Sequence, residues 1–241
     1  MALSSKRSRS PTRRGFLYRT GWWIARIILY FLAISIGLTM IYKFVPPPVT
    51  LTMLLDPNGF KKDWTPLSRI DRNMVAAVIA GEDAKFCTHH GFDGAAIEKA
   101  MERNADGGKL RGGSTISQQT AKNVFLWQGT GWTRYVRKGL EAWFTVLIEH
   151  IWGKRRIMEV YLNVAETGIG TYGAEAGAQR YYRHSAARLT PVEAARIAAA
   201  LPSPKKRAVI NATGFTRHHG NVIARRSGIV RHSALDSCVY D

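Results

Sequence analysis

The longest apolar stretch of the chain lies near its N-terminus. Residues 22–42 read WWIARIILYFLAISIGLTMIY, and their only charge is Arg26, near the start of the stretch. About 20 apolar residues cover the hydrocarbon core of a bilayer, so these residues predict one transmembrane helix. A cleaved signal peptide and a buried core helix are the competing interpretations. A signal needs a small-residue cleavage site, whereas here Pro46-Pro47-Pro48 follows, which favours a retained anchor.

Beyond a stiff, proline-rich spacer at 43–50, apolar positions recur at helical rather than strand spacing. The two clearest runs are Ile70, Met74, Ala77, Val78 and Gly81, and Ile157, Met158, Tyr161 and Leu162. The segment Thr190-Pro191-Val192-Glu193 has the pattern of a capping box that opens a helix. No strand-like alternation of useful length appears. The sequence therefore predicts an all-α domain over 51–241, with glycine-rich loops at 107–113, 129–131 and 168–173.

The positive charge of the chain is unevenly placed. The net charge is +18, and residues 1–43 hold eight Lys and Arg and no acidic residue. Most of this basic cluster precedes the apolar stretch, so the positive-inside rule places residues 1–21 in the cytoplasm and the large domain on the outer side. Both parts are basic, which favours anionic partners such as phosphates, anionic lipid or nucleic acid.

The two cysteines and the C-terminal segment carry little signal. Cys87 and Cys238 have neither the number nor the spacing of a disulfide framework or a zinc site, so two separate thiols are favoured over a bridge. Residues 205–241 hold seven Lys and Arg against two Asp, which suits a solvated or lipid-facing basic tail.

Two adjacent carboxylates, Glu82 and Asp83, follow the first apolar helical run. Burial and like-charge repulsion both raise the pKa of a carboxyl group, which suits one of them to proton transfer near neutral pH. From composition alone, surface ion pairs with Lys85 and a nearby arginine are the simpler interpretation. His89 and His90 follow, but adjacent histidines without further ligands are weak evidence for a metal site.

A second cluster reads GGSTISQQTAKN at 112–123. Thr115 and Gln118 have capping-box spacing, which predicts a helix start whose free backbone N–H groups can receive an anion. Gln119 and Lys122 lie three residues apart and share a helical face. A solvated, well-capped helix is an equally good interpretation. The segment is not a P-loop, because the Gly-Lys-Ser/Thr order is missing.

Two further segments say little by themselves. Arg137 and Glu141 lie four residues apart on one helical face, a pair that stabilises a surface helix by only about 0.3–0.5 kcal/mol. Residues 154–182 predict a helix, a flexible glycine loop and a second helix, which together form one wall of a groove. For most of these residues we expect a scaffold role.

Taken in order, five segments resemble the peptidoglycan glycosyltransferases, in their monofunctional biosynthetic transglycosylase form. The segments are EDAKFCTHHGFD at 82–93, GGSTISQQTAKN at 112–123, RKGLE at 137–141, KRRIMEVYLN at 154–163 and LTPVEAARIAAALPSP at 189–204. The resemblance covers roughly residues 46–205. It implies an all-α, lysozyme-like domain with a large lobe and a small membrane-proximal lobe, preceded by one transmembrane helix and not followed by a transpeptidase domain.

The resemblance also implies the chemistry. Such an enzyme polymerises lipid II into β-1,4-linked glycan strands, with inversion and release of undecaprenyl pyrophosphate. By position, Glu82 is implied as the general base, and Glu141 as a second carboxylate that orients Arg137 or helps to hold a pyrophosphate-bound cation. The residues implied to bind substrate and pyrophosphate are Ser114, Thr115, Gln119, Lys122, Asn123 and Arg137.

The implied partners are lipid II, the growing glycan chain, membrane lipid and other cell-wall synthesis or division proteins. The implied location is the inner membrane, with the catalytic domain in the periplasm. No metal site is implied, and a divalent cation as cofactor is left open. A lysozyme-like lytic enzyme is the alternative, and it would not need the phosphate grip of Lys122 and Arg137. A basic, membrane-tethered module that binds nucleic acid is not expected, because interleaved aromatic and basic residues are missing.

Overall fold

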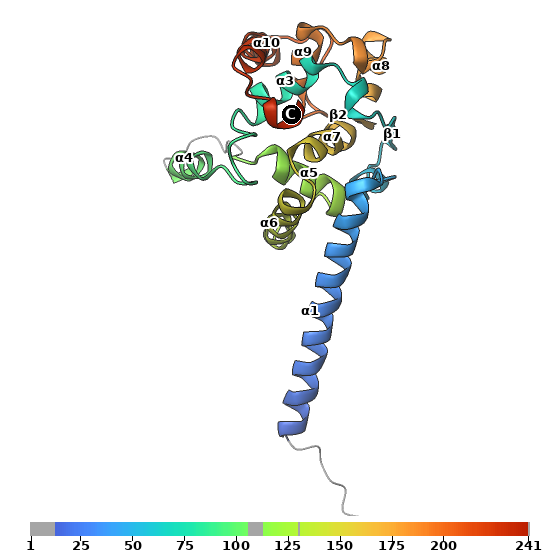
Figure 1. The fold of residues 1–241 in the computed structure, drawn as a ribbon, viewed down its shortest axis with the longest axis vertical. Coiled ribbons are helices and arrows are strands. Elements are labelled where there is room, and N and C mark those ends of the chain that lie inside the picture. Colours follow the sequence, from blue (N-terminus) through green and yellow to red (C-terminus); the bar gives the residue numbers. More distant parts are fainter. Residues whose placement is uncertain (1–12, 106–112, 130, 241) are drawn as a thin grey trace, which may run out of the picture. The chain divides into compact units, whose positions relative to one another are not determined.

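The computed structural model describes residues 13–105, 113–129 and 131–240 (Figure 1). The chain divides into two compact units, residues 1–41 and 42–241. The basic residues before position 13 and most of the predicted glycine loop at 107–113 lie outside the described residues.

The N-terminal unit is a helix that exposes its apolar side chains. Helix α1 (Arg13–Phe44) contains the 27-residue stretch Tyr18–Phe44, which is long and apolar enough to cross a membrane. The guanidinium of Arg26 lies 4.4 Å from the centroid of the Trp22 ring, and its Nη2 donates to the Tyr30 hydroxyl at 3.0 Å. A lone helix that shows this much apolar surface to water is unfavourable, so the helix is suited to a bilayer.

The second unit is built mainly from helices, as the sequence predicts. Its α-helices are α2 (Leu51–Leu54), α3 (Arg72–Glu82), α4 (Gly94–Ala105), α5 (Ile116–Phe125), α6 (Thr133–Ile151), α7 (Lys154–Val164), α8 (Ala174–Tyr182), α9 (Pro191–Ala200), α10 (Gly214–His232) and α11 (Ser237–Tyr240). Two 3₁₀ turns, η1 (Leu67–Arg69) and η2 (Ala186–Arg188), complete the helical elements.

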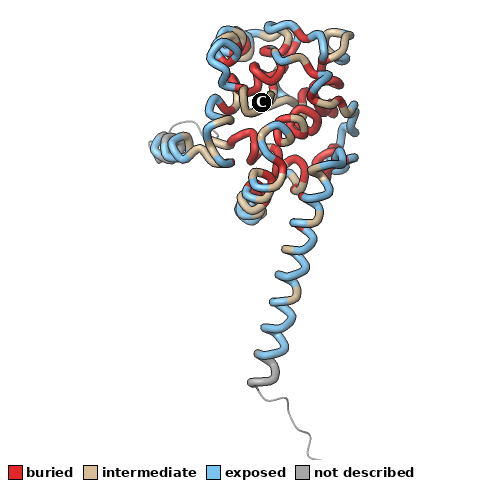
Figure 2. The backbone as a smooth tube through the Cα atoms, in the orientation of Figure 1, coloured by how far each residue is buried: buried red, intermediate tan, exposed pale blue. Residues whose placement is uncertain are grey.

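Helix α3 runs through the core of this unit. Every residue from Met74 to Ala80 is buried, and the helix packs against α9 and α10, while α5 packs against α6 and α7 (Figures 1 and 2). A helix that is apolar all round must be enclosed by other elements, and this one delivers its last residue, Glu82, from inside the core.

Both predicted capping boxes are confirmed. The Thr115 hydroxyl accepts from the Gln118 N–H at 3.2 Å, while Gln118 Oε1 accepts from the Thr115 N–H at 3.1 Å. Thr190 and Glu193 make the same reciprocal pair at the start of α9, with Pro191 in the first helical position. These local hydrogen bonds fix where α5 and α9 begin.

The prediction of a flexible glycine loop at 168–173 is wrong. Positions 168, 171 and 172 belong to a three-stranded sheet of order β1-β3-β2, and 169–170 form the turn between two of its strands. Strand β1 (Lys61–Lys62) is parallel and β2 (Glu166–Gly168) is antiparallel to β3 (Thr171–Tyr172). Strands of two or three residues are too short to show an alternation of polar and apolar positions. Gly170 joins β2 to β3 with φ 61°, and an added Cβ would lie 2.9 Å from the Gly59 carbonyl oxygen.

The interpretation of residues 205–241 as a basic tail is also wrong. Helix α10 packs on α9 and α3 and buries Ile223, Ser227 and Val230, while its arginines lie on the opposite, exposed side. The buried positions recur at helical spacing, but small and polar residues interrupt them. The segment is therefore part of the folded domain.

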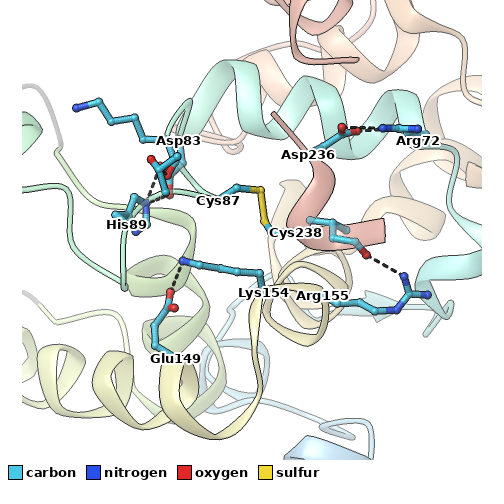
Figure 3. The surroundings of a disulfide bond; sticks show 12 residues. Arg72, Asp83, Cys87, His89, Glu149, Lys154, Arg155, Asp236 and Cys238 are labelled. Carbon is cyan, nitrogen blue, oxygen red and sulfur yellow. Dashed lines mark hydrogen bonds and ion pairs between the residues drawn. A yellow bond between two sulfur atoms is a disulfide. The ribbon is translucent and has the colours of Figure 1, made fainter. Parts of the chain in front are cut away.

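The two cysteines form a disulfide, contrary to the expectation of separate thiols. Cys87 and Cys238 have Cα atoms 5.5 Å apart although 151 residues separate them in sequence (Figure 3). Arg72 also holds the C-terminal segment, through two hydrogen bonds of 2.8 Å to the Asp236 carboxylate. Tertiary packing, including that of α11 against α7, brings the two thiols together, so their spacing carries no signal.

Candidate active site

Glu82 is the last residue of α3, and one of its oxygens has no partner. Its Oε2 accepts a hydrogen bond of 2.9 Å from Gln119 Nε2 on α5, while its buried Oε1 has no hydrogen-bond partner within the described part of the chain. The preceding residue, Gly81, lies against α10, where an added Cβ would meet Ile223 Cδ1 at 2.9 Å. Close helix packing therefore holds the carboxylate in a fixed place.

A buried tyrosine orients the side chain that holds Glu82. The hydroxyl of Tyr161, on α7, donates to Gln119 Oε1 at 3.2 Å, which turns the amide nitrogen of Gln119 toward Glu82. Burial raises the pKa of Tyr161 well above its ordinary value, and the charges of Glu82 and Asp83 raise it further. Tyr161 therefore stays protonated and remains a donor at every physiological pH.

The carboxyl group of Glu82 is suited to accept a proton. Burial raises its pKa above the ordinary value, and the charge of Asp83 raises it further. The hydrogen bond from Gln119 and the positive charges of Arg207 and Lys122 oppose this rise. A glutamate in such surroundings is a stronger base than an exposed one, and burial is the main reason.

Lys122 lies one helical turn beyond Gln119, and four charged groups act on it. Burial lowers its pKa, while Glu141 and Glu82 raise the pKa and Arg137 and Lys138 lower it. These residues come from α3, α5 and α6. The charges of Glu82 on α3 and of the charged residues on α6 therefore both act on Lys122.

The α6 end is an ion-paired group. Arg137 Nη1 donates to Glu141 Oε2 at 2.8 Å, and the Lys138 ammonium donates to the other oxygen of the buried Glu141. Arg137 Nε is buried and has no hydrogen-bond partner among the described residues. The group therefore holds two cations in place and keeps one guanidinium N–H available for an anion.

The N-terminus of α5 is less open than the sequence predicts. Asp83 Oδ2 accepts from the Ile116 N–H at 3.0 Å, and the Thr115 hydroxyl accepts from the Gln118 N–H. The Thr115 hydroxyl also donates to the Gly91 carbonyl oxygen at 2.7 Å, whereas Ser114 Oγ accepts from Lys138 at 3.3 Å. The Asp83 carboxylate therefore already occupies the N–H of Ile116, and the Thr115 hydroxyl occupies that of Gln118.

A cavity of about 600 Å³ opens beside these residues. Gln119, Lys122, Asn123 and Tyr161 form part of its wall, and Leu201 to Lys206 form another part. Gln119 both lines the cavity and bonds Glu82, so one side chain connects the cavity wall to the carboxylate. Polar groups that converge on a concave site of this size are typical of substrate binding.

The structure brings most of the predicted residues into this region. Gln119 contacts Glu82, Arg137 contacts Glu141, and Lys122 feels the charge of both acids. Thr115 is different, because its hydroxyl is used within the fold.

No group of three or more His, Cys, Asp or Glu that could hold a metal ion occurs in the described ranges. His89 instead pairs with Asp83, with 2.9 Å from its Nε2 to each carboxylate oxygen.

Three residues of this region have no role assigned from the sequence. Tyr161 fits the apolar spacing of its helix, yet a buried tyrosine needs a partner for its hydroxyl, and that need is a signal. Lys138 lies next to Arg137 and shares Glu141 with it. Arg207 acts on the Glu82 carboxylate from just beyond the last matched segment, where nothing in the sequence indicates it.

Most of the chain matches a known protein family. Residues 50–228 match the transglycosylase family. The chain belongs to this family. The match extends beyond residue 205, the limit of the sequence resemblance, and includes most of α10. Helix α10, which packs against α3, is thus part of the transglycosylase domain.

Relatives of the same family cover nearly the whole chain. A biosynthetic peptidoglycan transglycosylase of Caulobacter vibrioides is 51% identical over 88% of this chain and 93% of its own length. Proteins of the same name from Rhodospirillum centenum and Xanthomonas axonopodis pv. citri are 44% and 46% identical, over 90% and 88% of this chain and 95% and 86% of their own lengths.

Proposed function

We propose that Glu82 is the general base of a reaction that polymerises lipid II into β-1,4-linked glycan. The chain is a peptidoglycan glycosyltransferase of cell-wall synthesis, as its family and its relatives indicate. The unpartnered, buried Oε1 of Glu82 supports the assignment of the base, since the other oxygen of the same carboxylate bonds Gln119, a residue of the cavity wall. A buried acceptor without a partner is unfavourable unless a ligand supplies the missing donor.

The proposed reaction is a single displacement. Glu82 takes the proton of the 4-hydroxyl of the acceptor sugar as that oxygen attacks C1 of the growing, lipid-linked chain. The new C–O bond forms while the bond from C1 to pyrophosphate breaks, and its electron pair leaves with undecaprenyl pyrophosphate. Attack from the face opposite the α-pyrophosphate gives a β-linked product, so the anomeric centre inverts.

The leaving group needs positive charge rather than an acid. We assign this role to Lys122 and Arg137, assisted by Gln119, Asn123 and Ser114. Both oxygens of Glu141 accept from cations, so we assign it the role of orienting Arg137 rather than that of holding a metal ion. Thr115 contributes by fixing the start of α5 through its capping bonds.

We further propose the arrangement at the membrane. Residues 1–21 form a cytoplasmic tail, 22–42 a single transmembrane helix, 43–50 a spacer and 51–241 the periplasmic catalytic domain. The basic residues before the apolar stretch support this orientation in the inner membrane. The catalytic domain would then lie on the side where the lipid-linked sugar is polymerised.

Incubation of the detergent-solubilised chain with labelled lipid II tests the activity, with the products separated by size on a gel. We expect a ladder of lengthening glycan. Release of small muropeptides from preformed peptidoglycan, without such a ladder, would instead identify a lytic enzyme. Glu82→Gln is the control that must remove the ladder if the carboxylate is the base.

A further inference from the structure

The cavity beside Glu82 has a second polar end, to which the proposed reaction gives no role. Gln119, Lys122 and Asn123 line one part of it, whereas Asp56, Glu166 and Lys205 line another. Glu166 belongs to β2, and Asp56 and Lys205 lie in loops far away in sequence. Three chain segments therefore bring two carboxylates and an ammonium to one wall of the substrate cavity.

Asp56 is fully bonded within the fold. Its Oδ2 accepts from the Tyr172 hydroxyl at 2.7 Å and from Lys205 Nζ at 2.9 Å, and its Oδ1 accepts from the backbone and side-chain nitrogens of Asn58. Burial alone would raise the pKa of Asp56, but these hydrogen bonds hold it well below its ordinary value. Asp56 is thus a permanent anion whose structural effect is to hold Lys205 in place.

Glu166 differs from Asp56 in its bonding. Its Oε1 is buried and has no hydrogen-bond partner among the described residues. Lys205 Nζ lies 3.7 Å from this oxygen, which is an ion pair but too long for a hydrogen bond. The oxygen therefore keeps its capacity to accept from a molecule in the cavity, while Lys205 stabilises its charge.

The surroundings indicate the chemistry of that molecule. This end of the cavity carries two carboxylates beside Lys205 and Lys206, so its charges offset one another, whereas Lys122 lines the other end, to which the proposed function assigns the pyrophosphate. Trp127, Leu201 and Pro202 give the same cavity apolar surface. An apolar wall with a hydrogen-bond acceptor fits a neutral sugar, whose ring has an apolar face and whose edge carries hydroxyl and acetamido N–H donors.

We propose that Glu166, held by Lys205, is a substrate-binding residue that accepts a hydrogen bond from a hydroxyl or amide N–H of a sugar in this cavity. The inference rests on the proposed function and deepens it, since it names a binding residue for the sugar part of the substrate. Under this proposal, Lys122 contacts the pyrophosphate of the substrate and Glu166 contacts its sugar.

Steady-state kinetics of the full chain on labelled lipid II test this role. Glu166→Ala should raise KM about tenfold or more, the usual effect of losing one hydrogen bond to a charged group, and should change kcat much less. Glu166→Gln keeps an acceptor oxygen and should recover most of the lost affinity. Asp63→Ala removes an exposed carboxylate elsewhere in the domain and serves as the matched control, with unchanged KM.

Direct binding separates this inference from the proposed function. The chain with Glu82→Gln should bind labelled lipid II in a fluorescence anisotropy titration without turning it over, and adding Glu166→Ala should weaken that binding about tenfold. Equal affinity of the single and double variants would overturn the role of Glu166 and leave that of Glu82 intact. Full turnover by Glu82→Gln would overturn the proposed base instead.

The inference can still be tested if Glu166→Ala fails to fold properly. If Glu166→Ala lowers the melting temperature strongly, Lys205→Met provides the second test, because it leaves Glu166 in place and removes only the ammonium that holds it. We expect Lys205→Met to raise KM by a smaller factor than Glu166→Ala. An unchanged KM in Lys205→Met, together with unchanged binding of lipid II by that variant, would contradict a sugar contact at this wall.

Discussion

Glu82 and Asp83 are neighbours in sequence, yet they belong to regions of opposite character. Glu82 belongs to what we call the catalytic wall, namely Glu82, Gln119, Lys122, Arg137 and Glu141. It keeps one buried oxygen without a partner among the described residues. Asp83 has different partners: both of its oxygens bond His89, and one also accepts from the Ile116 N–H. One carboxylate is open to a ligand, and the other is part of the scaffold.

The scaffold side continues into what we call the disulfide seam, namely Asp83, His89, Cys87, Cys238 and Asp236 (Figure 3). The disulfide links the loop after α3 to α11. The ion pair between Arg72 and Asp236 links α3 to the residue that precedes α11. The difference between the two regions teaches where this fold tolerates unmet hydrogen bonding. The seam satisfies its polar groups and gives stability, whereas the wall leaves atoms unpartnered for a substrate.

The strongest test of this contrast replaces each of the two neighbouring acids by its amide. Glu82→Gln should lower the polymerisation rate by about 10²–10⁴-fold, because a general base contributes about that factor, and should leave the melting temperature unchanged or slightly higher. Asp83→Asn should instead lower the free energy of unfolding by about 1–3 kcal/mol, because it weakens bonds to buried partners. Gel assays and thermal melts of both variants measure the two effects.

The cations of the catalytic wall give the next largest effect. Lys122→Ala and Arg137→Ala should each lower kcat by about 10²–10³-fold, because each leaves negative charge on the departing pyrophosphate without a partner. Arg134→Ala, an exposed arginine on the same helix as Arg137, is the control and should keep its activity. Near wild-type turnover in both wall variants would refute the proposed anion site, provided that circular dichroism shows them folded.

The disulfide seam should respond in stability more than in chemistry. Replacing both cysteines by serine should lower the free energy of unfolding by about 2–4 kcal/mol, because the bridge closes a long loop of the unfolded chain. Denaturant titrations of the variant and of the wild-type chain with and without a thiol reductant measure this loss. If the serine variant kept full stability, or if the reductant destabilised both proteins equally, the bridge would have no such role.

The pH dependence of kcat is the smallest expected effect, and it tests the protonation states of Glu82 and Lys122. Glu82 must be deprotonated to act, and burial raises its pKa, so the acid limb of kcat should lie above the ordinary glutamate value of 4.5. Lys122 must be charged, and burial lowers its pKa, so the alkaline limb should lie below 10.5. Lys122→Arg should move the alkaline limb upward in a pH–rate profile, and an unmoved limb would assign it to another group.

The same raised pKa has a consequence for folding. A carboxyl group with a higher pKa in the folded chain than in the unfolded chain stabilises the fold at low pH. That contribution is lost as the pH rises through the folded value. In the wild-type chain Glu82 therefore costs stability at neutral pH, which is why Glu82→Gln is not expected to lower the melting temperature.

Local patterns predicted the elements that depend on local interactions. The capping boxes of Thr115 and Thr190 and the apolar spacing of α3 and α7 placed those helices correctly, because a helix closes its hydrogen bonds within a few residues. The short strands around Gly170 gave no such pattern. The membrane-spanning stretch was visible because about 20 apolar residues in a row have few other uses.

The sequence by itself determined the helical class, the apolar anchor and the order of segments from Glu82 to Pro204 that marks the family. Tertiary structure decided which of two adjacent acids keeps an oxygen without a partner in the described part of the chain, that Cys87 meets Cys238, and that Tyr161, Lys138 and Arg207 join the site. It also placed Glu166 and Lys205 on the wall of the same cavity. The physical reason is distance along the chain: spacing reports contacts within a helix, whereas packing decides contacts between residues tens or hundreds of positions apart.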